Sequence, residues 1–339
     1  MSRFRSDRVA GVELADPALR AALEQGLQQV EELLHREVQS EFRFLTETSL
    51  HLVDAGGKRF RPLFTLLAAQ FGLGRGTGRV EDVVRAAAVV ELIHLATLYH
   101  DDVMDEATMR RGAASANARW DNTVAILTGD FLFAHASRLV ADLGPDAVRI
   151  IARTFAKLVT GQMRETLGPG EGIDPVQHYL AVVAEKTGSL IATAGRYGAM
   201  FSGAPQEQVD ALRRFGETIG TAFQISDDII DIASPATQSG KMPGTDLREG
   251  VRTLPMLYAL AEPGPGVTRL GELLAAPLTD DALVTEALAL LRGSPGLGRA
   301  VQALRSYTDT ARAELAVLPP CPARDALSSV TDYLQARTT

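Results

Sequence analysis

Two short acidic clusters in this sequence have a composition and spacing that could hold metal ions. They are Asp101, Asp102 and Asp105, and then Asp227, Asp228 and Asp231. Residues four apart on a helix lie about 40° from one another around its axis, so the outer two aspartates of each cluster would present two carboxylates on one face. Burying such charges without partners is costly. Hard divalent cations, and magnesium in particular, are the natural partners of dense carboxylate oxygen.

A single acidic cluster could equally be a solvated helix end. A calcium-binding loop is not indicated, because neither cluster has the glycine and the spaced ligands of an EF-hand. Two copies, each closing an apolar segment, favour the metal-binding interpretation. Those segments, Val80–Asp105 and Ile219–Ile232, are apolar nearly all round, which is typical of helices at the centre of a protein.

Basic residues accompany both clusters. They are Lys58, Arg59, Arg61, Arg110, Arg111, Lys186 and Lys241. Each alone is more often a solvated surface charge. Together with two carboxylate pairs they predict a site for diphosphate, because arginine makes planar bidentate contacts to phosphate and lysine supplies a point charge.

The rest of the chain reads as helix. Apolar residues recur at spacings of three and four, and period-two alternation is almost absent, so strands are not required. We expect a single all-α domain over residues 1–339, with about ten or more helices and a less distinctive C-terminal third. Helical patterns cover Leu19–Leu52, Leu63–Phe71, Val80–Glu106, Ala147–Leu167, Tyr179–Phe201, Gln208–Ile232 and Leu254–Ala261.

The overall composition is that of an ordinary globular protein. Of 339 residues, 46% are hydrophobic and 22% charged, enough for a sizeable core. The net charge of −8 and the lack of a Lys/Arg run argue against a nucleic-acid partner. Cys321 is the one cysteine, which fits a reducing compartment. Met1–Asp16 has no apolar run of the signal-peptide kind, and Ala86–Tyr99 is too short to span a bilayer, so we expect a cytoplasmic protein without a transmembrane segment.

The motifs and their order resemble the trans-isoprenyl diphosphate synthases, the polyprenyl synthetase family. Four segments between about residues 56 and 255 carry the resemblance: Gly56–Pro62 (GGKRxRP), Asp101–Gly112 (DDxxDxxxxRRG), Phe223–Asp231, and Gly240–Gly250 (GKxxGTDLxEG). The family implies a helical bundle of the isoprenoid synthase type, in which two aspartate motifs face each other across a central substrate cavity. It also implies a homodimer.

The resemblance further implies a role for each motif residue. Magnesium, three ions per active site once diphosphate is bound, would be held by Asp101, Asp102, Asp105, Asp227, Asp228 and Asp231. The allylic diphosphate would contact Arg110, Lys186, Thr187, Gln224 and Lys241, of which Lys186, Thr187 and Gln224 would act in catalysis. Isopentenyl diphosphate would be held by Lys58, Arg61, His94 and Arg111.

His94 also has a simpler explanation, since a lone histidine on an apolar helix is usually a satisfied core residue. It lies seven residues before Asp101, about two turns, and so shares a face with that aspartate. That spacing favours a contact with substrate.

In the implied reaction, the double bond of isopentenyl diphosphate attacks an allylic cation, and repetition lengthens the chain. Ile93, Ala96 and Thr97 lie eight, five and four residues before Asp101. In this family a bulky aromatic residue four or five before the motif stops growth early, so the small Ala96 and Thr97 predict a product longer than geranylgeranyl. Phe131 and Phe133 could still close the path, and the small residues could instead serve only close helix packing.

Three other functions stay open: a short-chain farnesyl or geranylgeranyl diphosphate synthase, a terpene cyclase, and a non-catalytic partner subunit. Cyclases usually carry a different second metal motif and have no need of Gly56–Pro62, and partner subunits typically lose aspartates or basic residues. The chain departs from the family pattern at Gly161–Glu165, at Val251–Arg252 and in the tail Gln335–Thr339, and no role is assigned there.

Overall fold

The computed structural model describes residues 8–9, 12–73, 78–233, 243–264 and 266–338. These residues are almost entirely helical, which confirms the predicted all-α class. They form two compact units: Met1–Ala156, Leu190–Gly216 and Glu314–Ser329 make unit 1, and Lys157–Ser189, Glu217–Ala313 and Val330–Thr339 make unit 2. The two aspartate motifs belong to different units, so their facing arrangement and the single domain stay predictions. Lys241 lies outside the described residues.

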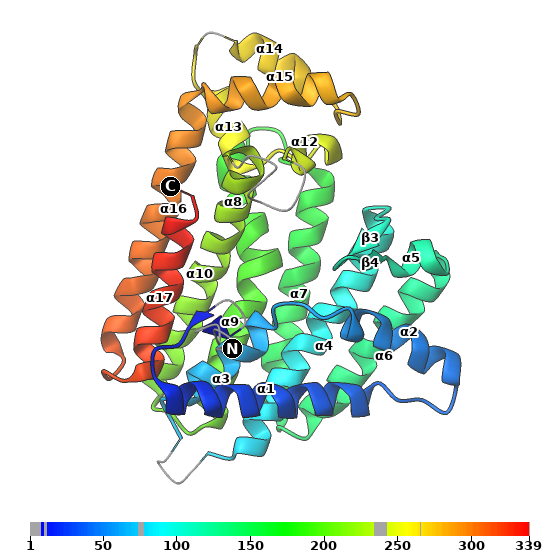
Figure 1. The fold of residues 1–339 in the computed structure, drawn as a ribbon, viewed down its shortest axis with the longest axis vertical. Coiled ribbons are helices and arrows are strands. Elements are labelled where there is room, and N and C mark those ends of the chain that lie inside the picture. The colour runs from blue at the N-terminus through cyan, green and yellow to red at the C-terminus, as the bar shows by residue number, and fades with distance from the viewer. Residues whose placement is uncertain (1–7, 10–11, 74–77, 234–242, 265, 339) are drawn as a thin grey trace, which may run out of the picture. The chain divides into compact units, whose positions relative to one another are not determined.

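Unit 1 is built mainly from the first half of the chain (Figure 1). It also receives the beginning of α7 (Pro145–Leu167), most of α9 (Ser189–Phe201), and the beginnings of α10 (Gln206–Ala233) and α17 (Pro322–Ala336). Its other elements are α1 (Pro17–Glu37), α2 (Arg43–Asp54), α3 (Phe60–Ala69), α4 (Val80–Met104), α5 (Ala116–Arg119), α6 (Asn122–Ala141), the 3₁₀ turn η2 (Leu315–Val317), and the antiparallel strand pairs β1–β2 (Arg8–Val9, Val12–Glu13) and β3–β4 (Met109–Arg110, Ala113–Ala114).

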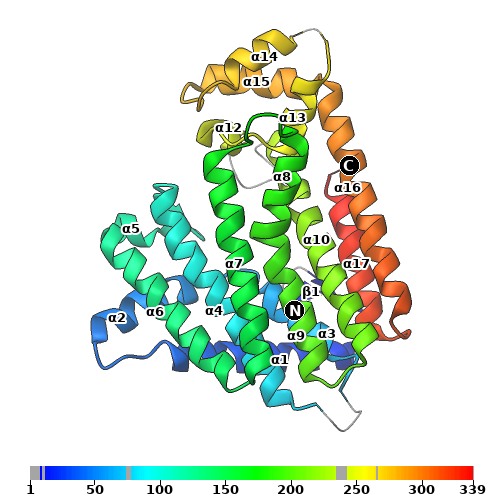
Figure 2. The same ribbon diagram turned by 180° about the vertical axis from the view of Figure 1, so that it is seen from behind.

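Helix α4 is the core helix of unit 1. It packs against α1, α3 and α6, and lies alongside α6 in both views (Figures 1 and 2). The approach to α6 depends on Gly129, because a Cβ there would lie 2.4 Å from His100 Nε2 and 3.1 Å from the carbonyl oxygen of Ala96. Tyr99, fully buried, donates its hydroxyl to Thr48 O and accepts from Leu52 N, which fixes α2 against α4. These contacts set the position of the acidic end of α4.

Unit 2 holds the second acidic cluster, at the end of α10 (Figures 1 and 2). It contains the rest of α7 and α10 and the end of α17, together with α8 (Pro175–Val183), the π-helical turn η1 (Ala184–Gly188), α12 (Thr245–Glu249), α13 (Leu254–Ala261), α14 (Val267–Leu273), α15 (Asp281–Arg292) and most of α16 (Pro295–Glu314).

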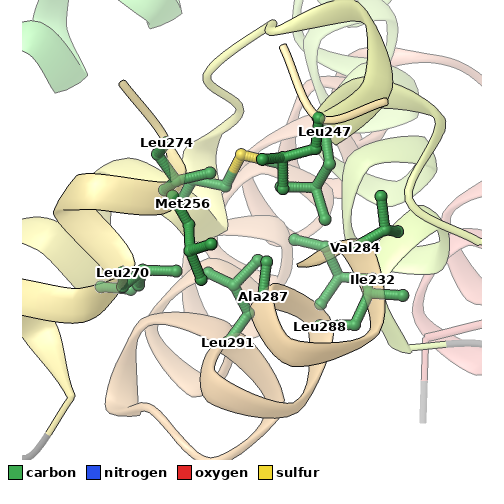
Figure 3. Packing of buried hydrophobic residues seen from close by; sticks show 12 residues of the cluster. Ile232, Leu247, Met256, Leu270, Leu274, Val284, Ala287, Leu288 and Leu291 are labelled. Atoms are coloured by element: carbon green, nitrogen blue, oxygen red, sulfur yellow. The ribbon is translucent and has the colours of Figure 1, made fainter. Parts of the chain in front are cut away.

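The less distinctive C-terminal third forms a hydrophobic core of its own. Figure 3 shows Ile232 of α10 and Leu247 of α12 packed with Met256, Val284 and Leu288 from α13 and α15. Arg292 Nε also donates to Ile232 O at 2.8 Å, which satisfies a carbonyl at the end of α10. This core therefore anchors both the last turn of α10 and the short helix that follows it.

Two expectations need correction. The apolar pattern over Leu19–Leu52 is not one helix: α1 ends at Glu37 and α2 begins at Arg43, and between them Ser40 N donates to Thr46 Oγ1 at 2.9 Å. Such a local bond to a side chain competes with the helical bond. The length argument against a membrane span also fails, because α4 and α6 are both long and apolar enough to cross a bilayer by composition alone. Most of that part of α4 is buried within the protein, and core helices pass the same test.

Candidate active site

The first aspartate motif closes α4 in helical geometry. Asp105 N donates to Asp101 O at 2.8 Å, so the helical period holds through the motif. This places the Asp101 and Asp105 side chains on one face, as predicted. Asp105 is exposed and Asp101 half-buried. The arrangement suits a cation that is shared between two carboxylates and an outside ligand.

Asp102 has a different environment from its two neighbours. It is fully buried, and its Oδ1 accepts a hydrogen bond from Arg110 Nε at 2.6 Å. Burial raises the pKa of the Asp102 carboxyl, and the Arg110 guanidinium opposes that rise. Its Oδ2 has no hydrogen-bond partner among the described residues. Arg110 is thus bound to the motif itself, with Nη2 at 4.0 Å from Asp105 Oδ2.

Three of the four residues predicted for isopentenyl diphosphate lie in one positively charged region of unit 1. Arg61 and Arg111 surround His94 closely enough that their charges, after burial, hold its pKa well below 6.5. His94 is therefore neutral. Arg61 Nε is buried with no hydrogen-bond partner among the described residues, and burial lowers the pKa of that guanidinium. Cationic groups with unused donors are suited to an anion. Lys58, by contrast, is exposed.

The glycine pair of the GGKRxRP segment makes room for Arg111. A Cβ on Gly57 would lie 2.9 Å from Arg111 Cζ, and the residue has φ +127°, a conformation that favours glycine. Arg111 donates to the carbonyl oxygens of Leu52, at 3.0 Å, and Gly56. The loop therefore holds this guanidinium in place through its backbone.

Glu91 balances this positive region. It is 2% exposed, and its Oε1 accepts from Arg59 Nη1 at 2.8 Å and lies 3.6 Å from Arg111 Nη2. Arg59 also binds both carboxylate oxygens of Glu31 and the carbonyl of Val53. Arg59 is consequently a structural residue, whereas Arg61 keeps a donor for a ligand.

The second aspartate motif lies in unit 2, where its last member organises the chain. Asp231 accepts hydrogen bonds from Thr245 N and Asp246 N, both at 3.1 Å. A carboxylate that accepts from the first amides of α12 acts as its N-terminal cap and is favoured by the helix dipole. Asp231 therefore links the second aspartate motif to α12, which lies within the GKxxGTDLxEG segment.

Asp228 is the buried member of the second motif. It is 2% exposed and accepts from Tyr179 Oη and, at 3.0 Å, from Gln224 Nε2. Burial raises the pKa of its carboxyl to about 7, against the lowering effect of those hydrogen bonds. Gln224, predicted to face the substrate, thus also orients an aspartate.

The environment of Asp246 shows whether the carboxyl groups near the second motif are suited to a cation. Burial, followed by repulsion from Asp228 and Asp231, raises the pKa of its carboxyl to about 8. No group of three or more His, Cys, Asp or Glu side chains within the described ranges is arranged to hold a metal alone. The mutual repulsion of Asp228, Asp231 and Asp246 fits a nearby cation, and magnesium usually takes only one or two carboxylates together with waters and substrate phosphate.

Lys186 and Thr187 lie in the π-helical turn η1, an irregularity often found at functional sites. Lys186 Nζ is 2.5 Å from Glu165 Oε2, and Arg164 Nε is 3.0 Å from Glu185 Oε2. Gly161 lets α7 approach this turn, since a Cβ there would lie 2.8 Å from Lys186 N. The segment Gly161–Glu165 thus positions the predicted catalytic lysine.

The residues predicted to control chain length lie on α4. Ile93 and Ala96 are 1% exposed, and Ala96 is at the close approach to α6. Thr97 is half-buried and donates its hydroxyl to His94 O at 2.8 Å. On α6, Phe133 packs on Phe155, with ring centroids 4.4 Å apart. A separate surface groove of about 380 Å³, lined by Arg36, Arg85 and Arg138 among others, contains none of the predicted site residues.

Comparison with known proteins identifies the family of this chain. The model of the polyprenyl synthetase family matches residues 42–291. The chain belongs to the polyprenyl synthetase family. A nonaprenyl diphosphate synthase of Mycobacterium tuberculosis is 60% identical over 97% of both chains.

Two solved structures share the fold. A geranylgeranyl pyrophosphate synthase from Corynebacterium glutamicum, complexed with calcium and isoprenyl diphosphate, superposes with a TM-score of 0.87 and 52% identity, covering 96% of this chain and 99% of that one. A decaprenyl diphosphate synthase from Rhodobacter capsulatus gives 0.86 and 36%, covering 95% and 99%.

These findings confirm the predicted enzyme class. The chain is a transferase, a trans-prenyltransferase of the polyprenyl synthetase family, with the all-helical isoprenoid synthase fold. Divalent metal ions are the cofactor class that the family and its calcium-bound member support. The individual residue roles stay predictions.

Several residues that shape the site were not found by sequence reasoning. They are Glu31, Glu91, Glu165, Tyr179, Asp246 and Arg337. The sequence contains only weak signals of these roles. Glu91 is a carboxylate within the apolar stretch Ala86–Tyr99, and Asp246 belongs to a motif from which only Lys241 was assigned.

Glu91→Gln should weaken the hold on isopentenyl diphosphate, because it removes the negative charge that keeps Arg59 and Arg111 in place. We expect the KM for isopentenyl diphosphate to rise on the order of tenfold, with a smaller change for the allylic substrate, and stability to fall by about 3 kcal/mol. Steady-state kinetics and thermal unfolding measure both. Glu81→Gln, on the exposed first turn of the same helix, is the matched control. Wild-type values in Glu91→Gln would contradict this role.

Proposed function

We propose that this chain condenses isopentenyl diphosphate with an allylic diphosphate, with magnesium, to give a trans-polyprenyl diphosphate longer than geranylgeranyl. The observation that carries the proposal is the positively charged region of Arg61, Arg111 and His94, in which the buried Arg61 Nε has no partner among the described residues. An enzyme that only cyclised or hydrolysed one diphosphate would not need it. A second diphosphate substrate explains it.

The basic residues other than Arg59 each have a task in this reaction. Arg61, Arg111, His94 and the exposed Lys58 bind the diphosphate of isopentenyl diphosphate, and neutral His94 adds a hydrogen bond without further charge. The apolar surface of α4 excludes water from the reacting carbons. A dedicated protein base is not required, because the departing diphosphate can accept the proton.

The allylic diphosphate is bound by Arg110 and Lys186, with Lys241 as a third basic contact. Thr187 and Gln224 direct side-chain oxygens to the positive charge that develops on the allylic group. The two aspartate motifs would hold magnesium, three ions once diphosphate is bound, which neutralises charge on the leaving group. Lys186 must exchange its ion pair with Glu165 for a contact to substrate.

Product length is supported by two independent facts. The 60% identical relative is named a nonaprenyl diphosphate synthase. Ala96 and Thr97 are small, where the family uses bulky aromatic residues to stop growth. The 52% identical geranylgeranyl pyrophosphate synthase makes a twenty-carbon product the main alternative.

Incubation of the purified chain with farnesyl diphosphate, labelled isopentenyl diphosphate and magnesium should give prenyl products beyond twenty carbons, resolved by chromatography. Products that stop at fifteen or twenty carbons would contradict the long-chain assignment. Turnover only after addition of a second protein would identify a partner subunit, and a hydrocarbon product without diphosphate would identify a cyclase.

Thr97→Tyr should shorten the product, because the ring would fill the path of the growing chain four residues before Asp101. The length distribution of products reports the effect, and Thr97→Ser, which keeps the hydroxyl bonded to His94 O, is the control. An unchanged distribution in Thr97→Tyr would show that the chain grows along another path.

We also propose a cytoplasmic homodimer. Helix α6 is apolar yet largely exposed, with Ile126 and Leu127 at 42% and 58%, and Phe42 beside α2 is 66% exposed. Apolar surface of this kind typically covers an interface. Light scattering on the purified chain should give twice the monomer mass, and Leu127→Asp should lower it. A monomeric wild type would contradict the proposal.

A further inference from the structure

Arg337, just after α17, lies on the second aspartate motif. Its Nε donates to Ser226 Oγ at 2.6 Å, its Nη2 is 3.5 Å from Phe223 O, and its Nη2 also forms an ion pair with the Asp227 carboxylate. All of these residues belong to unit 2. A basic residue thus occupies one of the carboxylates predicted to bind metal, in a tail to which sequence reasoning assigned no role.

This contact is built into the unit rather than made by a loose surface side chain. The Arg337 side chain is only 13% exposed, whereas Asp227 is 62% exposed. Arg337 Cζ lies 5.6 Å from the Phe223 ring and 5.7 Å from the Tyr333 ring, within the range of cation–π attraction. Ser226, which accepts from Arg337, is fully buried.

The end of α17 is fastened to α16, alongside which it runs in both views (Figures 1 and 2). Arg312 Nη2 is 2.7 Å from Asp332 Oδ1 and 3.1 Å from Thr331 Oγ1. Gln335 Nε2 donates to Thr308 Oγ1 at 2.5 Å. These bonds hold the end of α17 in place, so the Arg337 side chain can leave Asp227 without movement of the helix.

A divalent cation and a guanidinium cannot share the Asp227 carboxylate without mutual repulsion. We propose that Arg337 and a divalent cation compete for the Asp227 carboxylate, so that cation binding displaces the guanidinium and frees the residues that follow α17. This inference rests on the proposed metal-binding role of the second motif. Arg337 is a positioning residue in this account and does not touch the reacting carbons.

Manganese binding to the full chain, measured by calorimetry without diphosphate, tests the competition. Arg337→Gln should bind Mn²⁺ about five-fold more tightly than wild type, the scale of a partly exposed ion pair. Arg337→Lys, which keeps the charge, should stay near wild type. Arg324→Gln is the matched control, since Arg324 lies on the first turn of α17 and bonds only Leu318 O among the described contacts. Equal or weaker binding by Arg337→Gln, or no Mn²⁺ binding by any variant, would overturn the proposal.

Release of the tail is a second readout that does not depend on catalysis. Mn²⁺ should speed the removal of C-terminal residues from the wild-type chain by a carboxypeptidase, followed by mass spectrometry, and should have no such effect on Arg337→Gln. A wild-type tail equally protected with and without Mn²⁺ would contradict displacement. Because neither assay needs turnover, failure of the proposed prenyl transfer would appear separately, as cation binding without product.

Discussion

Charge held inside an apolar helical frame is the constraint on which the rest of this structure depends. Helix α4 carries two almost fully buried carboxylates, Glu91 and Asp102, whose buried neighbours on the helix are mostly apolar. Each would be strongly destabilising if unpaired. Glu91 is paired with Arg59 and lies near Arg111, and Asp102 is bound by Arg110. The residues that stabilise α4 are therefore partly the residues that would bind substrate.

The two units differ in which charged groups lack a complete set of partners. In unit 1 the charges of Arg61 and Arg111 act on neutral His94, and Arg61 Nε has no hydrogen-bond partner in the described part of the chain. In unit 2 burial, with added repulsion from neighbouring aspartates, raises the pKa values of Asp228 and Asp246 to about 7 and 8. The region in unit 1 is suited to an anion and the carboxyl groups in unit 2 are suited to a cation, as the proposed roles in binding isopentenyl diphosphate and magnesium require.

Much of this could be predicted from the sequence, because it depends on local spacing. Helical periodicity predicted the fold class, and the four-residue spacing of Asp101 and Asp105 predicted their common face. What could not be predicted depends on contacts between distant residues. Asp101 and Asp102 are adjacent in sequence, and only the structure shows that Asp102 is the buried one and that Arg110 is its partner. Likewise, no local pattern pairs Arg337 with Asp227 or Tyr179 with Asp228.

The central claim is that the buried carboxyl groups of unit 2 hold a cation. Its most direct test is the number of protons that the full chain releases when it binds magnesium at pH 7. Calorimetry in two buffers of different ionisation enthalpy measures that number. Because the pKa values of Asp228 and Asp246 are raised, these carboxyls are partly protonated at pH 7, and a cation that favours their ionised forms must displace protons. We expect proton release at pH 7. This release should disappear by about pH 9.5 and should be smaller in Asp246→Asn. Measurable magnesium binding without proton release at pH 7 would contradict it.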